Sequence, residues 1–205
     1  MTMKRDAKKW VRHSAERFLR RAGVRAKQIV LDFGCNEGNY AKAAARIVGP
    51  AGKIYALDED RKALGKLKRE AGKRNLGNIE CLHVSKDDNI PLPSLSVDVV
   101  LLYDVLHRGY LPEWEERERV LKEVHRILKP RGLLSLYPTH LKQYGMTFRR
   151  QIREVKGSGF RLRGESRRRL VHDGTLVRGR VFTFRKEHRG RGNVRRRAGR
   201  AVKGL

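Results

Sequence analysis

The chain has 205 residues, of which 49 are Lys or Arg and 22 are Asp or Glu, giving a formal net charge of +27. This length allows one domain with a sizeable core. It contains no run of about 18 apolar residues and no signal-peptide pattern, so we expect a cytoplasmic protein without integral membrane association. Its two cysteines, Cys35 and Cys81, lack C-x-x-C spacing, so we expect reduced thiols and no metal site.

The positive charge is unevenly distributed. Residues 141–205 hold 21 basic and 4 acidic residues, whereas residues 1–140 hold 28 and 18. A field of this size attracts polyanions, and an Arg/Gly-rich segment can contact phosphates. The alternative is a solubilising segment or a general bias towards basic residues. The sequence leaves both interpretations open.

Residues 4–21 are predicted to form an amphipathic helix with Trp10, Phe18 and Leu19 on one stripe. The next apolar strand, from Ile29, ends in the segment DFGCNEG at residues 32–38. Glycines at 34 and 38 tolerate the positive φ of a sharp strand-to-helix turn, which brings backbone N–H groups close to a ligand. A dinucleotide fingerprint would need glycine also at 36 and 39, where asparagines stand, so that class is excluded.

Strands and helices alternate through the rest of the chain, which predicts a parallel sheet covered on both faces. The predicted strands are 53–58, 79–84, 97–103 and one that follows a proline-glycine stop at 130–132; the predicted helices are 61–74, 112–128 and 141–157. The runs 159–170 and 176–185 are predicted to form a hairpin around His172-Asp173-Gly174-Thr175. The first run carries five arginines, so we expect an edge that faces solvent or a polyanion.

The spacing Asp32-x-Gly34-x-Asn36-x-Gly38 resembles the first motif of class I S-adenosylmethionine-dependent methyltransferases, acid-x-Gly-x-Gly-x-Gly. Asn36 replaces a glycine, and asparagine tolerates left-handed backbone geometry. Three later blocks match the family in order: an acid closing the second strand, Ile-Pro before the strand Val-Asp-Val-Val, and Lys-Pro-Arg-Gly at 129–132. The matches extend over about residues 28–138 and are most similar to the small-molecule branch, of quinone and sterol type.

The resemblance implies a fold and a cofactor. The expected fold is an α/β Rossmann-like three-layer sandwich, with a mostly parallel seven-stranded sheet and a C-terminal antiparallel hairpin. Residues 1–25 would be an N-terminal lid helix, 26–186 the S-adenosylmethionine-binding domain, and 187–205 a basic tail that is disordered in isolation. In this arrangement Trp10 and His13 would line the pocket. The alternative is that Trp10 packs in the core and His13 lies at the surface.

The resemblance also implies roles for individual residues. The turn residues Gly34, Cys35, Asn36 and Gly38 would contact the cofactor. Asp32 would attract its cationic methionine end, directly or through ordered water. Asp58 would bind both ribose hydroxyls; the alternative is a helix N-cap, which Glu59 or Asp60 could equally provide. The adenine-contacting acid falls near Lys86 or Asp87, and we assign it to Asp87.

Tyr103 and Asp104, at the end of the strand 97–103, would line the methionine end of the cofactor. His107 is the candidate general base, with a purely pocket-shaping role as the alternative. Methyl transfer is an in-line displacement, so a base is needed only if the acceptor arrives protonated.

Three functions follow as hypotheses. The first is methyl transfer to a small-molecule or lipid-like acceptor. The second is RNA or ribosome-directed methyl transfer that uses the basic C-terminal region. The third is a non-catalytic nucleic-acid-binding module that keeps the fold, suggested by Asn36. The Asn/Asp-Pro-Pro-aromatic motif of amino-group methylation on bases is absent, and no cysteine is placed to attack a pyrimidine, which argues against the best-marked base methylases.

Overall fold

The structure, a computed structural model, describes residues 4–85 and 89–187. The predicted contact of Asp87 and the tail after residue 187 lie outside the described residues. Six helices and seven strands are described in that part of the chain. In order they are α1 Arg5–His13, α2 Ala15–Arg21, β1 Ile29–Phe33, α3 Asn39–Val48, β2 Lys53–Asp58, α4 Arg61–Gly72, β3 Ile79–His83, β4 Val97–Tyr103, α5 Trp114–Ile127, β5 Leu128–Tyr137, α6 Phe148–Gly157, β6 Phe160–His172 and β7 Thr175–Lys186.

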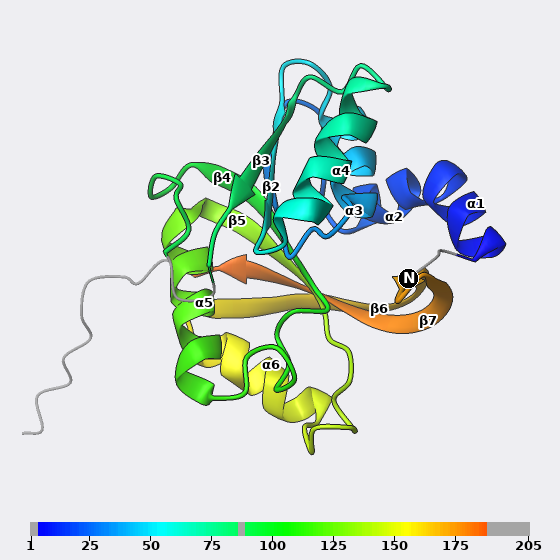
Figure 1. Ribbon diagram of the computed structural model, residues 1–205. Coiled ribbons are helices and arrows are strands. Elements are labelled where there is room, and N and C mark those ends of the chain that lie inside the picture. The colour runs from blue at the N-terminus through cyan, green and yellow to red at the C-terminus, as the bar shows by residue number, and fades with distance from the viewer. Residues whose placement is uncertain (1–3, 86–88, 188–205) are drawn as a thin grey trace, which may run out of the picture.

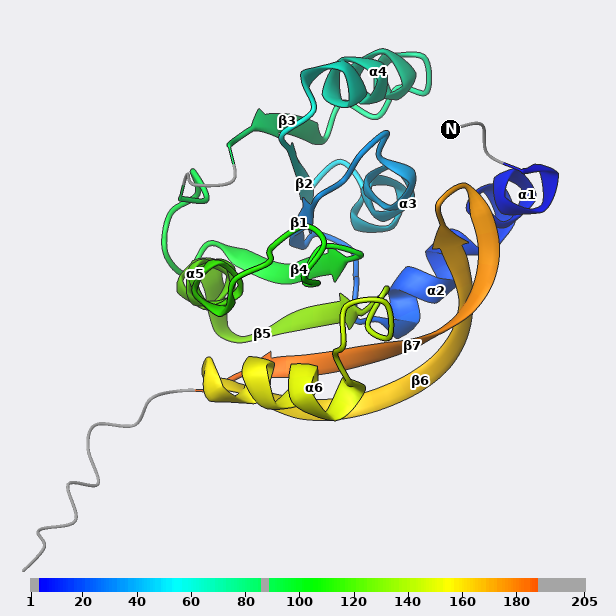
Figure 2. The same cartoon turned by 60° about the horizontal axis from the view of Figure 1, so that its bottom comes forward.

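All seven strands belong to one sheet in the order β3-β2-β1-β4-β5-β7-β6. The first five are parallel, and β7 joins β5 antiparallel and pairs with β6 in the hairpin. Helices cover both faces, with α1 to α4 on one side and α5 and α6 on the other (Figures 1 and 2). This three-layer α/β arrangement confirms the expected fold class.

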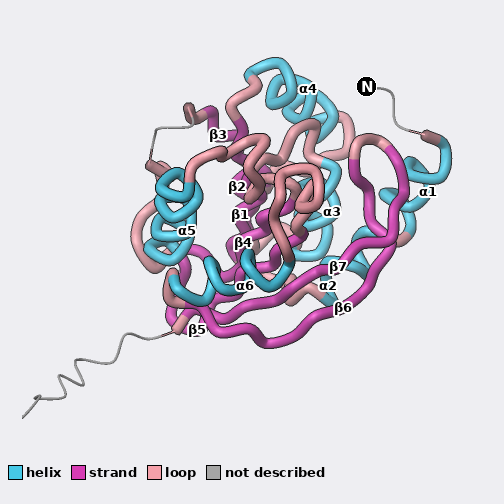
Figure 3. The backbone as a smooth tube through the Cα atoms, turned by 90° about the horizontal axis from the view of Figure 1, so that it is seen from below, coloured by secondary structure: helices cyan, strands magenta, loops and turns pink. Residues whose placement is uncertain are grey.

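The register aligns the carboxyl ends of the parallel strands. Phe33 pairs with Leu57 on one side and with Leu102 on the other, and Tyr103 pairs with Tyr137. The loops that follow β4 and β5 therefore emerge at the same edge of the sheet, on the side seen in Figure 3. In open α/β sheets this edge is where ligands bind, so the candidate site residues come together there.

The predicted N-terminal helix is divided into two. Ser14, with φ −124° and ψ −22°, interrupts the helical geometry between α1 and α2. The bend allows Trp10 of α1 and Phe18 of α2 to pack together, with ring centroids 5.6 Å apart, and both against Tyr40 of α3. The expectation of one continuous helix over 4–21 is therefore wrong, because packing of these aromatic rings favours the bend over a straight helix.

The hairpin of β6 and β7 is longer than its pairing with the sheet requires. It curves beyond β5, and its turn reaches α1, where the Lys4 amide donates a 2.8 Å hydrogen bond to the Gly174 carbonyl (Figure 2). The turn residues Asp173 and Gly174 both have positive φ, at 47° and 68°, as a two-residue hairpin turn requires. The predicted hairpin is confirmed, and β6 is the edge strand as its arginines indicated.

The helix predicted from residue 141 begins seven residues later. Residues 141–145 form turns, Gly145 has φ 63°, and the Thr147 side chain caps α6 by accepting the Arg150 amide. The left-handed geometry at Gly145 ends any regular helix before the cap. The loop from 138 to 147 carries His140 to the candidate site.

Candidate functional site

The glycine-rich turn connects β1 to α3 and has the left-handed geometry that its sequence predicts. Gly34, Asn36 and Gly38 have φ of 72°, 48° and 71°. A Cβ at Gly34 would lie 2.5 Å from Val105 Cγ2, and one at Gly38 would lie 2.3 Å from Leu67 Cδ1. Both glycines are therefore required by close packing as well as by φ, whereas Asn36 fits its position despite replacing a glycine.

The N–H groups of this turn already have acceptors inside the protein. The amides of Gly34 and Cys35 donate to the Leu57 carbonyl at 2.9 and 3.0 Å. The Asn36 amide donates to Asp58 Oδ2 at 2.7 Å, and the Glu37 amide to the Asn36 side chain at 2.7 Å. The expectation that this turn presents free amides to a ligand is not met in this conformation, because β2 and the turn itself accept them.

Asp32 is buried on β1, 2% exposed, and its Oδ2 has no hydrogen-bond partner among the described residues. Burial raises the pKa of its carboxyl to about 7, against the opposing hydrogen bond from the Ala41 amide. A buried carboxylate oxygen without a donor is costly unless a ligand supplies one. A cationic group of a cofactor at this edge would satisfy Asp32, so the residue fits the role expected of it.

Asp58, at the end of β2, does not cap the following helix. Asp60 is the N-cap of α4 and accepts the amides of Lys62 and Ala63 at 2.7 and 3.2 Å. Asp58 instead accepts the amides of Asn36 and Asp60, at 2.7 and 2.9 Å. These two bonds fix the carboxylate beside the turn while each oxygen keeps further acceptor capacity for a hydroxyl group.

A small apolar cavity of about 20 Å³, enough for about one water molecule, lies near these two motifs. Its lining comes from the ends of β1 and β2, from the segment after β3 and from α5: Phe33, Leu57, Val84, Ser85, Ile90, Tyr110, Leu111, Arg119, Val120 and Glu123. The segment after β3 is the one in which the adenine-contacting acid was expected. The apolar lining suits a flat ring such as adenine, but the cavity in this conformation is smaller than an adenine.

Cys35 and Tyr103 are buried and packed against protein groups. Burial raises the pKa of the Cys35 thiol far above its usual value, so the thiol stays protonated. The Tyr103 hydroxyl shares a 2.8 Å hydrogen bond with Ser135 Oγ, and its ring packs edge-on against Tyr40 with centroids 5.0 Å apart. Both cysteines are free thiols. Any ligand contact from residues 35 and 103 would therefore come mainly from their backbone.

Trp10 and His13 lie away from this edge. Trp10 is 8% exposed and belongs to the core between α1, α2 and α3, and His13 is exposed. Neither lines the two cavities described in this structure. The placement matches the alternative interpretation given for both residues.

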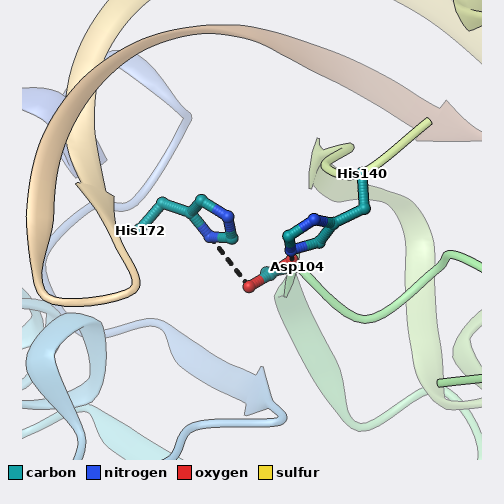
Figure 4. A group of neighbouring side chains, drawn as sticks. All are labelled: Asp104, His140 and His172. Atoms are coloured by element: carbon teal, nitrogen blue, oxygen red, sulfur yellow. Dashed lines mark ion pairs between the residues drawn. The ribbon is translucent and has the colours of Figure 1, made fainter. Parts of the chain in front are cut away.

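Asp104 lies at the centre of a cluster of histidines that the sequence predicted only in part. His172 Nδ1 lies 2.9 Å from Asp104 Oδ2, and the Nε2 atoms of His107 and His140 each lie 3.6 Å from Asp104 Oδ1. Figure 4 shows the side chains of Asp104, His140 and His172 pointing toward one another from three different segments. His107 and Asp104 were predicted as site residues, whereas His140 and His172 were not.

A signal for one of the two missed histidines was present in the sequence. His140 follows the strand that ends at Tyr137, and the carboxyl end of a parallel strand is a place to look for ligand contacts. His172 was interpreted only as part of the hairpin turn. Its arrival beside Asp104 depends on the curvature of the long hairpin, which no local pattern encodes.

The cluster changes the protonation of its members. Burial lowers the pKa of His107, while contact with Asp104 outweighs burial and raises the pKa of His172. Burial alone would raise the pKa of Asp104, but the contacts with His172 and Thr139 reverse this and lower it. Asp104 is therefore a carboxylate at neutral pH, and His107 is a neutral imidazole.

A larger hollow of about 340 Å³ lies on the hairpin side of the same edge. It is lined by aromatic, proline and arginine residues: Tyr137, Pro138, Phe148, Arg167, Arg178, Gly179 and Arg180. Arg180 forms a two-pronged ion pair with Glu165, at 2.6 and 2.7 Å, and its guanidinium lies 4.3 Å from the Phe148 ring centroid. Tyr137 also contacts His172, so the hollow adjoins the histidine cluster.

The chain is similar to known methyltransferases. A family model described as "Methyltransferase domain" matches residues 31–136, just over half of the chain. The demethylmenaquinone methyltransferase of Geobacillus kaustophilus is 33% identical over 118 residues, 58% of this chain and 48% of that protein. That of Lactobacillus johnsonii is 29% identical over 125 residues, 60% of this chain and 49% of that protein. The chain thus spans about half the length of the curated relatives it matches.

Solved structures give the same result for the fold. A SAM-dependent methyltransferase from Aquifex aeolicus superposes with a TM-score of 0.68 at 22% identity, covering 87% of this chain and 91% of that one. TrmN from Thermus thermophilus superposes with a TM-score of 0.65 at 26% identity, covering 84% of this chain and 48% of that one. Within the described residues, no helix combines the length and the apolar character needed to cross a membrane.

Proposed function

This chain belongs to the methyltransferase domain family, and we propose that it transfers a methyl group from S-adenosylmethionine to a small acceptor with an aromatic, quinone-like ring. The observation that carries the proposal is the pair of carboxylates beside the left-handed turn. Asp32 is buried with one oxygen unpartnered, and Asp58 is fixed by two backbone amides. The names of the matched relatives support the choice of acceptor class.

The residues present fit the cofactor. When bound, S-adenosylmethionine supplies a methyl group on a positively charged sulfur. Asp58 would accept hydrogen bonds from the ribose hydroxyls through the lone pairs that Asn36 and Asp60 leave free. Asp32 would attract the cationic methionine end, and its burial strengthens that attraction because little water screens it. Gly34 and Gly38 let the left-handed turn pack closely against Val105 and Leu67, which would hold it beside the cofactor.

The acceptor would bind in the hollow lined by the end of β5, the first residue of α6, and β6 and β7. The hollow beside Tyr137 has a volume within the range of small-ligand pockets. Its aromatic residues suit a flat ring, and the guanidinium of Arg178 suits a carbonyl or anionic oxygen on that ring. These properties support a small aromatic acceptor. For an in-line displacement the protein must orient this acceptor toward the methyl group.

His107 stays our proposed proton acceptor for an acceptor that arrives protonated. Its Nδ1 accepts the Gly109 amide at 3.1 Å, so the neutral ring carries its proton on Nε2. In this conformation the ring must release the Gly109 amide before Nδ1 can take a proton. The ring stacks on Tyr144, with centroids 5.7 Å apart and 3° between planes, and this contact fixes its orientation.

The direct test is transfer of labelled methyl groups by the full chain, with separation of the products into organic-soluble, protein and RNA fractions. We expect label in an organic-soluble aromatic acceptor and its loss in the Asp58→Ala variant. Arg178→Ala should raise KM for the acceptor without weakening the cofactor affinity. Label in RNA alone, with none in the organic-soluble fraction, would rule out the proposed acceptor.

RNA is a second candidate acceptor, favoured by the basic edge strand. Residues 161, 163, 167, 168 and 169 of β6 are arginines, and β6 is an edge strand of the sheet that residues 4–85 and 89–187 form. Replacing Arg161 and Arg163 by Ser should then flatten the salt dependence of RNA binding, because fewer counterions are released. An unchanged slope of log affinity against log salt would exclude this edge as an RNA contact.

The non-catalytic alternative was suggested by Asn36, which stands where the resembled motif has glycine. Asn36 adopts the left-handed geometry of the glycine that it replaces, with φ 48°. Cofactor binding separates the two cases, since a ligand at about 100 times its dissociation constant stabilises the folded state by about 2.7 kcal/mol. A thermal shift with S-adenosylmethionine is therefore expected, and its absence would favour the binding module.

A further inference from the structure

Asp104, His140 and His172 bring three ligating side chains of the described chain to one point. Asp104 follows β4, His140 follows β5 and His172 ends β6. One ligand atom from each residue lies within 4.8 Å of the other two (Figure 4). The three residues come from sequence positions 104, 140 and 172, so the cluster is a product of the fold and not of a local turn.

The spacing of the ligand atoms matches a shared cation. Two ligand atoms that are each about 2.1 Å from a metal lie roughly 3.0 to 3.4 Å apart at angles near 90 to 109°. His172 Nδ1 and Asp104 Oδ2 are 2.9 Å apart, and His140 Nε2 and Asp104 Oδ1 are 3.6 Å apart. These two contacts end on different oxygens of Asp104, and the set of one ligand atom from each residue lies within 4.8 Å, so binding of an ion would draw the three side chains closer together.

The other nitrogen of each ring faces an acceptor. His140 Nδ1 lies 3.2 Å from Gln143 Oε1, which can only accept, so the proton belongs on Nδ1 and the Nε2 lone pair faces Asp104. His172 Nε2 lies 3.4 Å from Asp173 Oδ2, which leaves Nδ1 to face Asp104. An acceptor on the non-ligating nitrogen is the usual support of a metal-bound histidine.

Two further features fix the geometry of this cluster. His172 Nδ1 is buried and faces Asp104 Oδ2 at 2.9 Å. The Thr139 hydroxyl donates to Asp104 Oδ1 and orients the carboxylate. Asp104 and His140 also have φ of 58° and 53°, so both hold strained backbone geometry.

We propose that Asp104, His140 and His172 bind one divalent late transition-metal ion of the Zn²⁺ class. Two imidazoles and one carboxylate suit Zn²⁺, Co²⁺, Ni²⁺ or Fe²⁺ better than Ca²⁺ or Mg²⁺, which prefer oxygen ligands. Three protein ligands leave a coordination position for water or for an oxygen of a small molecule. His107 is not a ligand, because its Nδ1 is occupied by the Gly109 amide and its Nε2 carries the proton.

The site lies beside the hollow described above, since the Tyr137 ring contacts His172 with centroids 6.1 Å apart. An oxygen of a small molecule in the hollow would have the open coordination position close by. Metal binding is a property separate from methyl transfer, because it is measured without a methyl acceptor. Failure of the metal site would therefore leave the proposed function intact, and failure of methyl transfer would leave the metal site intact.

To test the site, the full chain is first treated with a chelator to remove bound metal. It is then titrated with Zn²⁺, followed by calorimetry, and separately with Co²⁺, followed by visible absorption. We expect about one ion per chain and the d–d absorption bands of a low-coordinate Co²⁺ with nitrogen ligands. His140→Ala and His172→Ala should lose the bands, while the neighbouring variant His107→Ala and the remote variant His83→Ala should keep them. Gln143→Ala and Asp173→Asn should weaken binding by about 10- to 100-fold.

Two results would overturn the proposal. One is the absence of stoichiometric binding by the unmodified chain. The other is a Co²⁺ spectrum that His140→Ala and His172→Ala leave unchanged. If an alanine variant fails to fold, His140→Gln and His172→Gln provide the same comparison, with circular dichroism as the check. The increase in Tm that Zn²⁺ gives to the unmodified chain should also disappear in these variants and persist in His107→Ala.

Discussion

The backbone amide of Asn36 donates a 2.7 Å hydrogen bond to Asp58 Oδ2, linking the glycine-rich turn to the end of β2. The two residues are 22 positions apart in the sequence and belong to the two motifs that were assigned to the cofactor. One carboxylate thus holds the turn in place and is also the group that we propose for the ribose hydroxyls. Removing the Asp58 side chain should therefore lower the affinity for the cofactor by more than the loss of protein stability accounts for.

The variant Asp58→Asn tests this link. It should weaken S-adenosylmethionine binding by roughly 2 kcal/mol or more, because charge-assisted hydrogen bonds are replaced by weaker ones. Asp60→Asn is the matched control, since Asp60 only caps α4 and asparagine also caps helices well. Calorimetric titration of both variants should separate them, and equal affinities would contradict the role given to Asp58.

Gly38 and Gly145 separate steric crowding from backbone strain. Both have positive φ, 71° and 63°, but a Cβ at Gly38 would clash with the Leu67 side chain, whereas nothing in the described chain lies within 4 Å of one at Gly145. Gly145→Ala should therefore cost about 1 to 2 kcal/mol of left-handed strain. Gly38→Ala should cost about 1 to 3 kcal/mol more, the typical cost of overpacking. Urea unfolding measures both losses, and equal losses would show that Leu67 adjusts freely.

Asp32 should make the stability of the ligand-free protein depend on pH. Its pKa is raised from 3.8 to about 7 by burial, so the folded state binds the proton more tightly than the unfolded chain does. The free energy of unfolding therefore falls as pH rises from about 4 to about 7, with an upper limit of about 1.4 kcal/mol per pH unit. Below the ordinary pKa of 3.8, Asp32 is protonated in both the folded and the unfolded state, so it no longer makes stability depend on pH.

Asp32→Asn removes this titration. Unfolding at pH 5 and at pH 8 should show that the variant loses less stability over this range than the unmodified chain. At pH 8 the ligand-free variant should be the more stable by roughly 1 to 4 kcal/mol. Cofactor affinity should fall in the same variant, because the negative charge is gone. Parallel pH profiles for the two chains would show that Asp32 is not the group responsible.

Tyr40 connects α3 to the edge strand. Its hydroxyl donates to the Val171 carbonyl at 2.9 Å and accepts the Val171 amide at 3.1 Å. Tyr40→Phe would leave both backbone groups without this partner and should destabilise the fold by about 1 to 3 kcal/mol. Tyr144→Phe is the control, because in the described part of the chain the Tyr144 hydroxyl accepts one long bond, 3.4 Å from the exposed Gln143. Equal stability of the two variants would exclude the bridge as a structural element.

Much of the fold could be predicted from local pattern. The alternation of apolar runs with helical segments, together with the glycines at 34 and 38, predicted the parallel core and the order of its strands along the chain. The stop predicted at 130–132 is wrong, because β5 begins at Leu128 and contains these residues. The turn at Asp173-Gly174 identified the hairpin. These features depend on residues close to one another in the chain, so the sequence carries them directly. The break at Ser14 and the late start of α6 could not be seen, because packing and a left-handed glycine decide them.

The sequence by itself determined the glycine-rich turn, the acids at the ends of β1 and β2 and the basic character of β6, since each depends on residue type at a fixed local position. Tertiary structure alone decided which residue caps α4, which carboxylate holds the turn, and that His172 meets Asp104 and His140. The hairpin must curve across the end of the sheet to bring position 172 to position 104, and that curvature comes from strand twist and packing against α1. Contacts between distant segments are set by the assembled core, which no short window of sequence contains.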